Sequence, residues 1–410
     1  MRRSRLAGPM LAAAFTISYL GMAGAANAGG YVETDLVIGG PDVDHATKPP
    51  TLTDKNGIKH QAPFDKNLVN PWGIAASGTS PFWISDNNAG VSTLYDAQGN
   101  PRSLVVSIPL PPPNDPLQPG GTPTGAVFNI AQGAGAFPIP GFSPPNCNMR
   151  TTAPATFLFA TEDGTIVGWN PNLYPTMTLC NAGGPQTHGI IRIDHSNNGK
   201  GAVYKGLAIA TTEFGGATFL YAANFRAGRV EIYGPNFELL FVFTDLALLR
   251  DGYAPFNIVP IRMKNEDADT LVVTFAKPKL PDRHDDQAGP GNGFVDMFDL
   301  FGFERHRFAS HGDLNSPWGV ALAPSDFGDL SGALLIGNFG DGRINAFDPD
   351  SGMSLGKVKD NNGQPIVIEG LWAIKFGTDN PNEGTHNTLF FTAGVNDESD
   401  GLFGKLSPLR

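Results

Sequence analysis

The chain repeats one pattern of apolar and polar positions six times. Each copy has a short apolar run such as Phe82–Ile84, then a polar turn, then a segment that opens on glycine. In that segment an apolar residue stands two positions after the glycine and an aromatic residue five positions after it. Ser92 and Leu406 are the two lapses. The six glycines are Gly90, Gly164, Gly228, Gly293, Gly342 and Gly401.

Each copy indicates a β-hairpin, because an apolar run, a turn and an alternating segment are typical of one. A further apolar strand precedes every hairpin, and a fourth follows in some copies, as at 104–108 and 239–243. The six preceding strands are 72–74, 125–127, 206–209, 256–258, 318–320 and 372–374. Units spaced 49 to 74 residues apart predict an all-β fold, a six-bladed β-propeller whose blades cover one another's faces. A β-sandwich is the alternative, and six copies in register weigh against it.

The last unit has only three strands. Residues 31–37, near the other end of the sequence, alternate in the manner of a strand. An incomplete last blade would leave a sheet edge bare. We therefore expect this N-terminal strand to supply the outer strand of the last blade and to close the ring.

The composition agrees with short strands joined by turns. Of 410 residues, 51 are glycine and 35 are proline, 41% are hydrophobic and only 16% are charged. This hydrophobic share supports a sizeable core and argues against a disordered chain or a coiled coil. The formal net charge of −11 argues against nucleic acid or an anionic lipid surface as a partner.

The first 28 residues have the form of an export signal. Arg2, Arg3 and Arg5 precede a mostly apolar stretch, and Ala26-Asn27-Ala28 is typical of a cleavage site. The apolar stretch is shorter than the roughly 20 residues that a membrane anchor needs. The first arginine pair hints at twin-arginine export, although the residues after it do not complete that pattern.

We expect residues 1–28 to be a signal peptide and residues 29–410 to form a single propeller domain. Pro/Gly-rich loop insertions are expected at 109–155 and at 277–292. No later apolar run is long enough to span a bilayer. The expected product is therefore an extracytoplasmic monomer, secreted or periplasmic, with no transmembrane segment.

Cys147 and Cys180 are the only cysteines of the chain. In an oxidising compartment two cysteines most simply form one disulfide. Metal binding is the weaker interpretation, because the Cys-x-x-Cys spacing of metal sites is missing. The sequence predicts a disulfide between Cys147 and Cys180.

From about residue 67 onward the chain holds a set of distinctive short motifs. They are Asn70-Pro-Trp-Gly-Ile74, Ala160-Thr-Glu-Asp-Gly-Thr-Ile-Val-Gly-Trp169, Val203-Tyr-Lys-Gly-Leu-Ala208, Tyr221-Ala-Ala-Asn-Phe225, Ala254-Pro-Phe-Asn257, Gly289-Pro-Gly-Asn-Gly-Phe-Val295, Ser316-Pro-Trp-Gly319, Gly337-Asn-Phe-Gly-Asp-Gly-Arg-Ile344 and Gly370-Leu-Trp-Ala373. Together they resemble an uncharacterised family of exported bacterial propeller proteins. The resemblance implies an NHL-like six-bladed propeller and an extracytoplasmic location, and it implies no catalytic residues.

Amide and carboxylate side chains recur where the expected strands reach one rim of the ring. Ligands of propellers usually bind at the channel mouth, where such loops meet. A ring of these oxygens suits a hard divalent cation, above all Ca²⁺. At any single position a turn-forming Asn or Asp is the favoured alternative, by roughly two to one. The rim candidates are Asn70, Asp86, Glu162, Asn224, Asn257, Asn338 and Glu369, of which Glu369, Asn70 and Asn257 are the expected metal ligands.

His284 lies in the most reactive-looking stretch, the loop inside the fourth hairpin, and we expect it on that same rim. His284 or Asp86 could handle a proton, although a solvated charge cluster is the favoured alternative for this loop. The sequence offers no nucleophile–base pair, Walker A motif or His-Glu-x-x-His motif.

Two functions remain open at this level. The first is a recognition module that binds an unknown small molecule, glycan or protein at the channel mouth. The second is a metal-dependent hydrolase of the lactonase or esterase type, with a divalent cation in the channel, an analogy that rests on fold.

Overall fold

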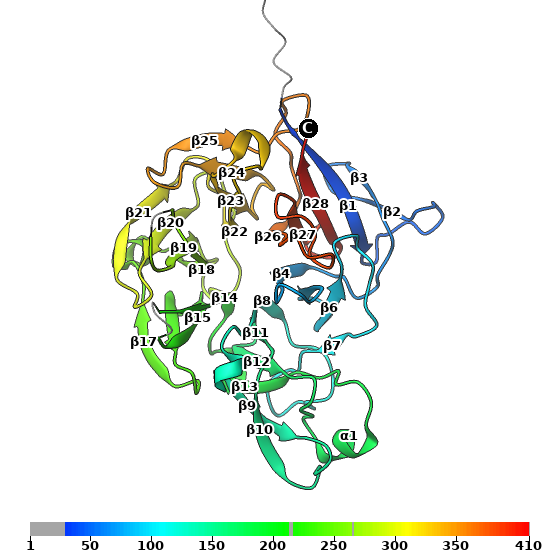
Figure 1. Cartoon of the computed structure of the whole chain (residues 1–410). Helices are drawn as coiled ribbons and strands as arrows, with labels where there is room; N and C mark the ends of the chain where they lie inside the picture. The colour runs from blue at the N-terminus through cyan, green and yellow to red at the C-terminus, as the bar shows by residue number, and fades with distance from the viewer. Residues whose placement is uncertain (1–28, 213–215, 265, 410) are drawn as a thin grey trace, which may run out of the picture.

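The structure, a computed structural model, describes residues 29–212, 216–264 and 266–409. Six four-stranded antiparallel sheets stand around one axis (Figure 1). The prediction of an all-β, six-bladed propeller is therefore confirmed. The predicted signal peptide, residues 1–28, lies outside the described residues.

In the first three blades the strands follow one another from the axis outward. Blade 1 contains β4 (Pro71–Ala75), β5 (Phe82–Asp86), β6 (Val91–Tyr95) and β7 (Val106–Ser107). Blade 2 contains β8 (Pro123–Phe128), β11 (Phe157–Thr161), β12 (Thr165–Trp169) and β13 (Ile190–Asp194). Blade 3 contains β14 (Tyr204–Thr211), β15 (Thr218–Asn224), β16 (Arg229–Tyr233) and β17 (Leu239–Phe243).

The other three blades continue the ring in the same order. Blade 4 contains β18 (Ala254–Ile261), β19 (Thr270–Ala276), β20 (Phe294–Phe298) and β21 (Glu304–Ser310). Blade 5 contains β22 (Pro317–Leu322), β23 (Leu334–Asn338), β24 (Ile344–Phe347) and β25 (Ser354–Lys357). Blade 6 contains β26 (Leu371–Phe376), β27 (Leu389–Ala393), β28 (Gly401–Pro408) and β1 (Tyr31–Gly39).

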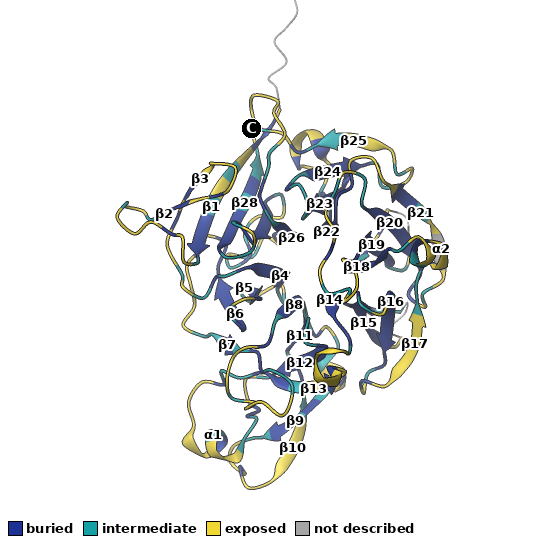
Figure 2. Cartoon of the chain, turned by 180° about the vertical axis from the view of Figure 1, so that it is seen from behind, coloured by how far each residue is buried: buried dark blue, intermediate teal, exposed yellow. Residues whose placement is uncertain are grey.

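The core lies between the blades, and burial decreases from the axis to the outer edge (Figure 2). Strands β5 and β11 are buried along their whole length, because each is covered by a neighbouring blade on both faces. Such strands are therefore almost continuously apolar rather than alternating. The outermost strands β17 and β25 are mostly exposed.

The six inner strands contact one another in a closed ring, and small residues permit this close approach. A Cβ built on Gly73 of β4 would lie 2.5 Å from the carbonyl oxygen of Thr124 in β8. A Cβ on Gly319 of β22 would lie 2.8 Å from the carbonyl oxygen of Trp372 in β26. Glycine is needed at these positions for contact with the next backbone, not for a positive φ.

Strand β1 closes the ring as the sequence predicted. It pairs antiparallel with β28, from Tyr31 opposite Pro408 to Gly39 opposite Gly401. The β1 side chain of Ile38 is fully buried in the core between blades 5 and 6. The first and last described strands thus complete one sheet.

The sequence predicted a Pro/Gly-rich loop at 109–155 around an inner strand at 125–127. That strand is present as β8, but the rest is not loop throughout, because it also contains a two-stranded sheet formed by β9 (Pro138–Phe142) and β10 (Arg150–Pro154). The outer part projects beside the ring rather than over it (Figure 1). The predicted disulfide is confirmed: Cys147 is bonded to Cys180 of helix α1 (Met177–Ala182).

The remaining elements are short. A second hairpin, β2 (Thr51–Thr53) and β3 (Lys59–Gln61), lies against β1. Helix α2 (Leu246–Arg250) follows β17, and the described residues include 3-10 turns at Gln132–Ala134, Asn197–Gly199 and Gly328–Leu330. In the part of the chain that the structure describes, no helix is long and apolar enough to cross a membrane.

The contribution of β1 can be measured with two substitutions on the same strand. Ile38→Ala removes a fully buried side chain and should cost about 2–5 kcal/mol of unfolding free energy. Val32→Ala, at a position that is 45% exposed, should cost less than about 0.5 kcal/mol. Equal effects of the two variants in urea unfolding would contradict the burial of β1 in the closed ring.

Candidate functional site

Large side chains fill the axis of the propeller where the inner strands begin. Each inner strand places one residue at this level: Trp72, Thr124, Lys205, Phe256, Trp318 and Trp372. The rings of Trp72 and Trp372 stack with their centroids 3.4 Å apart, and Trp318 stands edge-on, 6.0 Å from each of them. We call this set of six side chains the axial layer. All three tryptophans are buried, so the layer closes the channel.

A bulge near the start of the inner strands positions these side chains. The pairing register shifts between Pro71 and Ile74 in β4 and between Pro317 and Gly319 in β22. A bulge adds an unpaired residue and changes the direction of a side chain. Trp72 and Trp318 occupy these bulges. The recurring Pro-Trp-Gly motif therefore combines an aromatic residue for the axis with a glycine for close packing.

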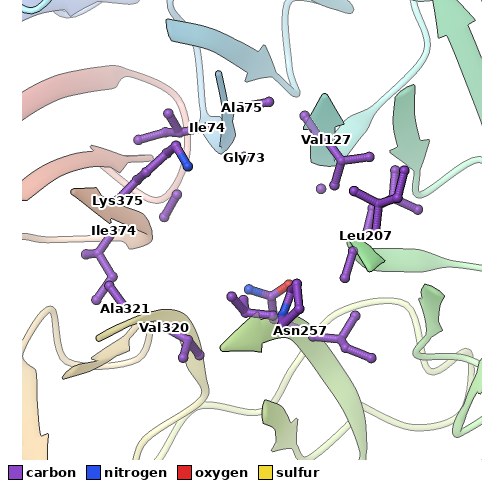
Figure 3. Close-up of a pocket in the computed structure, with 18 of the residues that line it drawn as sticks. Gly73, Ile74, Ala75, Val127, Leu207, Asn257, Val320, Ala321, Ile374 and Lys375 are labelled. Atoms are coloured by element: carbon purple, nitrogen blue, oxygen red, sulfur yellow. The ribbon is translucent and has the colours of Figure 1, made fainter. Parts of the chain in front are cut away.

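An apolar chamber lies on one side of the axial layer (Figure 3). It has a volume of about 470 Å³ and is lined by the later residues of the inner strands, such as Ile74, Val127 and Leu207. Its polar side chains include Asn257 and Lys375 (Figure 3), and burial lowers the pKa of Lys375. The apolar lining gives this chamber few groups that could orient a polar ligand.

A polar chamber of about 720 Å³ lies on the other side of the layer. The residues before the inner strands and after the second strands form its wall, together with the loop between β19 and β20. Phe339 stacks on Trp372 at 4.0 Å between centroids and contributes to its lining. The charged lining residues are Lys55, Glu162, Lys205, Lys279, Asp285, Asp286, Asp341, Arg343, Glu369, Asp397 and Glu398.

Lys205 joins the axial layer to the polar chamber. Its ammonium lies 4.9 Å from the ring centroid of Trp72 and forms an ion pair with Glu162. The side chains of Lys205 and Glu162 are only 3% and 9% exposed. Asn87 donates a hydrogen bond to the other Glu162 oxygen at 2.9 Å. A buried charge needs a partner of this kind, because desolvation is otherwise too costly.

Several other acids of the chamber already have partners. Glu369 accepts hydrogen bonds from the backbone N–H groups of Lys55 and Asn396, both at 2.9 Å. The Lys55 ammonium lies 2.7 Å from an oxygen of Asp397. Asp341 pairs with Arg343 at 2.9 Å. These contacts give each of the three acids a partner, although only two cations face three carboxylates.

Asp286 and Glu398 have no such partner. Among the described residues, neither forms an ion pair with Lys or Arg, and the buried Asp286 Oδ2 accepts no hydrogen bond. Burial, then repulsion by Glu162, raises the pKa of Glu398 to about 7. Burial also raises the pKa of Asp286. The chamber therefore carries acidic groups that a bound cation would stabilise.

Backbone conformation at Glu398 is unusual. Asn396, Asp397 and Glu398 have φ values of 55°, 52° and 68°, three successive non-glycine residues in the left-handed region. For Glu398 this conformation costs roughly 1–2 kcal/mol, whereas Asn and Asp adopt it more readily. The hydrogen bond from the Asn396 N–H to Glu369 and the contact of Lys55 with Asp397 hold the turn. Strain of this kind clusters at binding and catalytic sites.

His284 lies beside the chamber, as the sequence predicted for its loop. Its Nδ1 is 2.9 Å from Asp285 and 3.9 Å from Glu162. The ligand atoms of these three residues lie within 4.8 Å of one another, a spacing that could hold a metal ion. The hydrogen bond to His284 lowers the pKa of Asp285 to about 2. The ammonium of Lys205 already pairs with one oxygen of Glu162, so it competes with a metal ion for that carboxylate.

The structure brings three of the seven rim candidates together: Asn70, Glu162 and Glu369 line the polar chamber. Asn70 accepts a hydrogen bond from Trp372 Nε1 at 2.9 Å and so also supports the axial layer. Asn257 lies in the apolar chamber and donates to the Trp318 carbonyl oxygen at 2.7 Å. The expected metal set of Glu369, Asn70 and Asn257 is thus divided by the layer.

The other three rim candidates lie inside their blades. Asp86 is fully buried, accepts a hydrogen bond from the Thr93 N–H at 3.0 Å, and has a pKa raised by burial. Asn224 donates to Glu231, and Asn338 donates to the Asp313 carbonyl oxygen. These Asn and Asp side chains form hydrogen bonds within the protein rather than facing a ligand, which is the alternative that the sequence left open.

Sequence reasoning missed the residues that define the site: Lys205, the three tryptophans and Glu398. The sequence did carry a signal for the axial residues. In each inner strand the axial residue stands directly before a small residue, and Trp72, Lys205 and Trp318 all precede glycine. Glu398 carried no signal, because its position depends on a left-handed turn of three successive residues, in which Asn396 and Asp397 tolerate the left-handed conformation but Glu398 does not favour it.

The fold and the closed axis define a six-bladed propeller with a polar chamber at one end. No protein-family model matches the chain. Two uncharacterized proteins of Acanthamoeba polyphaga mimivirus are each 31% identical to it, over 358 and 353 residues. These matches cover 86% and 83% of this chain and 78% and 81% of the relatives. The chain therefore belongs to the same family as these viral proteins, which do not support the bacterial origin implied by its motifs.

Solved structures with a similar arrangement include two enzymes. Virginiamycin B lyase from Staphylococcus aureus is 15% identical, with a TM-score of 0.42 and coverage of 83% of this chain and 97% of the lyase. PQQ-bound aldose sugar dehydrogenase from Streptomyces coelicolor is 14% identical, with a TM-score of 0.44 and coverage of 83% and 95%. At these identities the likeness concerns the fold alone.

The buried pair of Lys205 and Glu162 can be tested by a double-mutant cycle. Lys205→Met should cost about 3–5 kcal/mol, because it leaves the Glu162 carboxylate buried without its cation. Adding Glu162→Gln to that variant should restore part of the loss, with a coupling of about 0.5–3 kcal/mol in denaturant unfolding.

Arg262→Met is the matched control, because Arg262 pairs with Asp269 on the surface. It should cost less than about 1 kcal/mol. A Lys205→Met variant as stable as this control would show that the pair does not support the axial layer.

Proposed function

We propose that the protein is an exported recognition module that binds a small, positively charged molecule in the polar chamber. The observation that carries this proposal is the presence of Asp286 and Glu398, two acids of the chamber wall without an ion-pair partner among the described residues. A ligand cation would supply the missing charge. Phe339, which is partly exposed in the same chamber, offers a ring face for a cation.

The size of the chamber favours a small ligand over a folded protein. Its volume of about 720 Å³ falls in the range of small-molecule sites. The axial layer closes the far end, so a ligand enters and leaves by the same mouth. Only the terminal residues of a glycan chain could enter a chamber with a single mouth. A neutral glycan would also leave Asp286 and Glu398 without a cation.

Export is part of the proposal. The disulfide between Cys147 and Cys180 supports it, because such bonds persist in oxidising compartments. A secreted or periplasmic location would also expose the chamber to small solutes outside the cytoplasm.

A metal-dependent hydrolase of the lactonase or esterase type is the second candidate. The cluster of Glu162, His284 and Asp285 favours it, since these residue types can hold a divalent cation. A bound ion would require Glu162 to share or release the Lys205 ammonium. Asp86, buried inside its blade, has no route to a substrate in the chamber.

Putrescine and its uncharged analogue butanediol provide the test of the recognition function. We expect calorimetry to detect binding of putrescine at millimolar concentration or below, with butanediol at least tenfold weaker. Asp286→Asn and Glu398→Gln should each weaken putrescine binding several-fold. Asp350→Asn, in an exposed turn of blade 5, is the control and should leave binding unchanged.

The same putrescine titration can be repeated at different pH values. Glu398 has a pKa of about 7 and faces Glu162, Lys205, Asp285 and Asp286. A cation prefers the ionised carboxylate, so putrescine affinity should rise up to about tenfold from pH 6 to pH 8. Glu398→Gln should flatten this rise. Absence of putrescine binding, or metal-dependent hydrolysis of a simple lactone that Lys205→Met increases, would favour the second candidate instead.

A further inference from the structure

A second group of titratable side chains lies between β1 and the β2–β3 hairpin, outside the lining of the polar chamber. Glu33 and Asp35 are two residues apart on β1, and their side chains share one face of the strand. His60 lies in β3, and Asp54 directly follows β2. The ligand atoms of Glu33, Asp35 and His60 lie within 4.8 Å of one another.

His60 is held in a defined orientation. Its Nδ1 lies 3.1 Å from Asp35 Oδ1, and the other Asp35 oxygen accepts the Gln61 N–H at 3.1 Å. With the proton on Nδ1, His60 donates to Asp35 and leaves Nε2 with a free lone pair. A carboxylate that orients a histidine through its second nitrogen is the usual support of a metal-binding imidazole.

Two buried polar atoms of this group have no hydrogen-bond partner among the described residues: His60 Nε2 and Asp54 Oδ2. The side chains of His60 and Asp54 are only 3% and 0% exposed. The two atoms face each other at 3.9 Å, too far for a hydrogen bond. Two ligands that are each about 2.1 Å from a shared ion can be this far apart. Asp54 Oδ1 is already used by the Ile58 N–H at 2.7 Å.

The group also carries an excess of negative charge. Three carboxylates surround one imidazole, and no Lys or Arg of the described chain forms an ion pair with any of them. An ion would remove both the excess negative charge and the two unsatisfied atoms.

We propose that His60 Nε2 and Asp54 Oδ2 bind a divalent transition-metal ion, with Asp35 of β1 orienting the imidazole and Glu33 as the neighbouring carboxylate, and that this site fastens the ring-closing strand to the β2–β3 hairpin. One imidazole nitrogen with carboxylate oxygens suits Zn²⁺ or Mn²⁺ better than Ca²⁺, which takes oxygen ligands. The site is separate from the polar chamber, so its role is structural and independent of the proposed recognition function.

Calorimetry and thermal unfolding of chelator-treated protein test the site with Zn²⁺, Mn²⁺ and Ca²⁺ alone. We expect one Zn²⁺ or Mn²⁺ per chain at this site and a rise of several degrees in the melting temperature. Asp54→Asn and His60→Gln should each weaken binding at least tenfold and abolish the rise. If His60→Gln fails to fold, the nearly isosteric Asp54→Asn variant decides the outcome.

Two matched histidine variants locate the ion. His284→Gln removes the histidine beside the polar chamber, and His386→Gln removes an exposed histidine that contacts Asp326 and Asp379. Both should keep the metal-dependent rise in melting temperature. No binding by the intact protein, tightest binding by Ca²⁺, or a rise lost in His284→Gln but kept in His60→Gln would overturn the proposal.

Discussion

The stacking of Trp72 on Trp372 at the propeller axis is the contact on which the rest of the structure depends. Six inner strands can approach one axis only if small residues separate the backbones, as Gly73 and Gly319 do. The space that remains at the next level is then filled by large side chains. The stacked tryptophans, with Trp318 edge-on, divide what would be a channel into two chambers of opposite character.

The buried pair of Lys205 and Glu162 links this packing to the proposed binding site. Lys205 takes the place that a tryptophan holds in blades 1, 5 and 6, so the axial layer carries one positive charge. Glu162 pairs with that charge, and Asp286 and Glu398, which both lie near Lys205, have no ion-pair partner of their own among the described residues. The polar chamber thus contains one fixed cation, already paired with Glu162, among more acids than it can compensate.

Much of the fold followed from the sequence, because glycine, apolar and aromatic positions recur at fixed offsets in every blade. The closing strand was also predictable, since three strands of the last unit left one place empty. The hairpin β9–β10 was not, because its proline-rich strands lack the usual strand signal.

The site was only partly predictable. Of the expected rim residues, Asn70, Glu162 and Glu369 line the polar chamber. Asp86, Asn224 and Asn338 turn into their own blades, and Asn257 passes to the other side of the axial layer. The sequence pattern locates a residue along its strand, and so along the propeller axis, only to within one or two positions. At the axis, one position separates the two chambers.

The central claim is that the axial layer closes the propeller and leaves a polar chamber with a single mouth. A crystal structure at a resolution that shows ordered water tests this claim most directly. We expect ordered waters in the polar chamber down to Trp72 and Trp372, with none passing between the three tryptophans. A continuous file of waters along the axis, or tryptophan rings turned aside from an open channel, would contradict it.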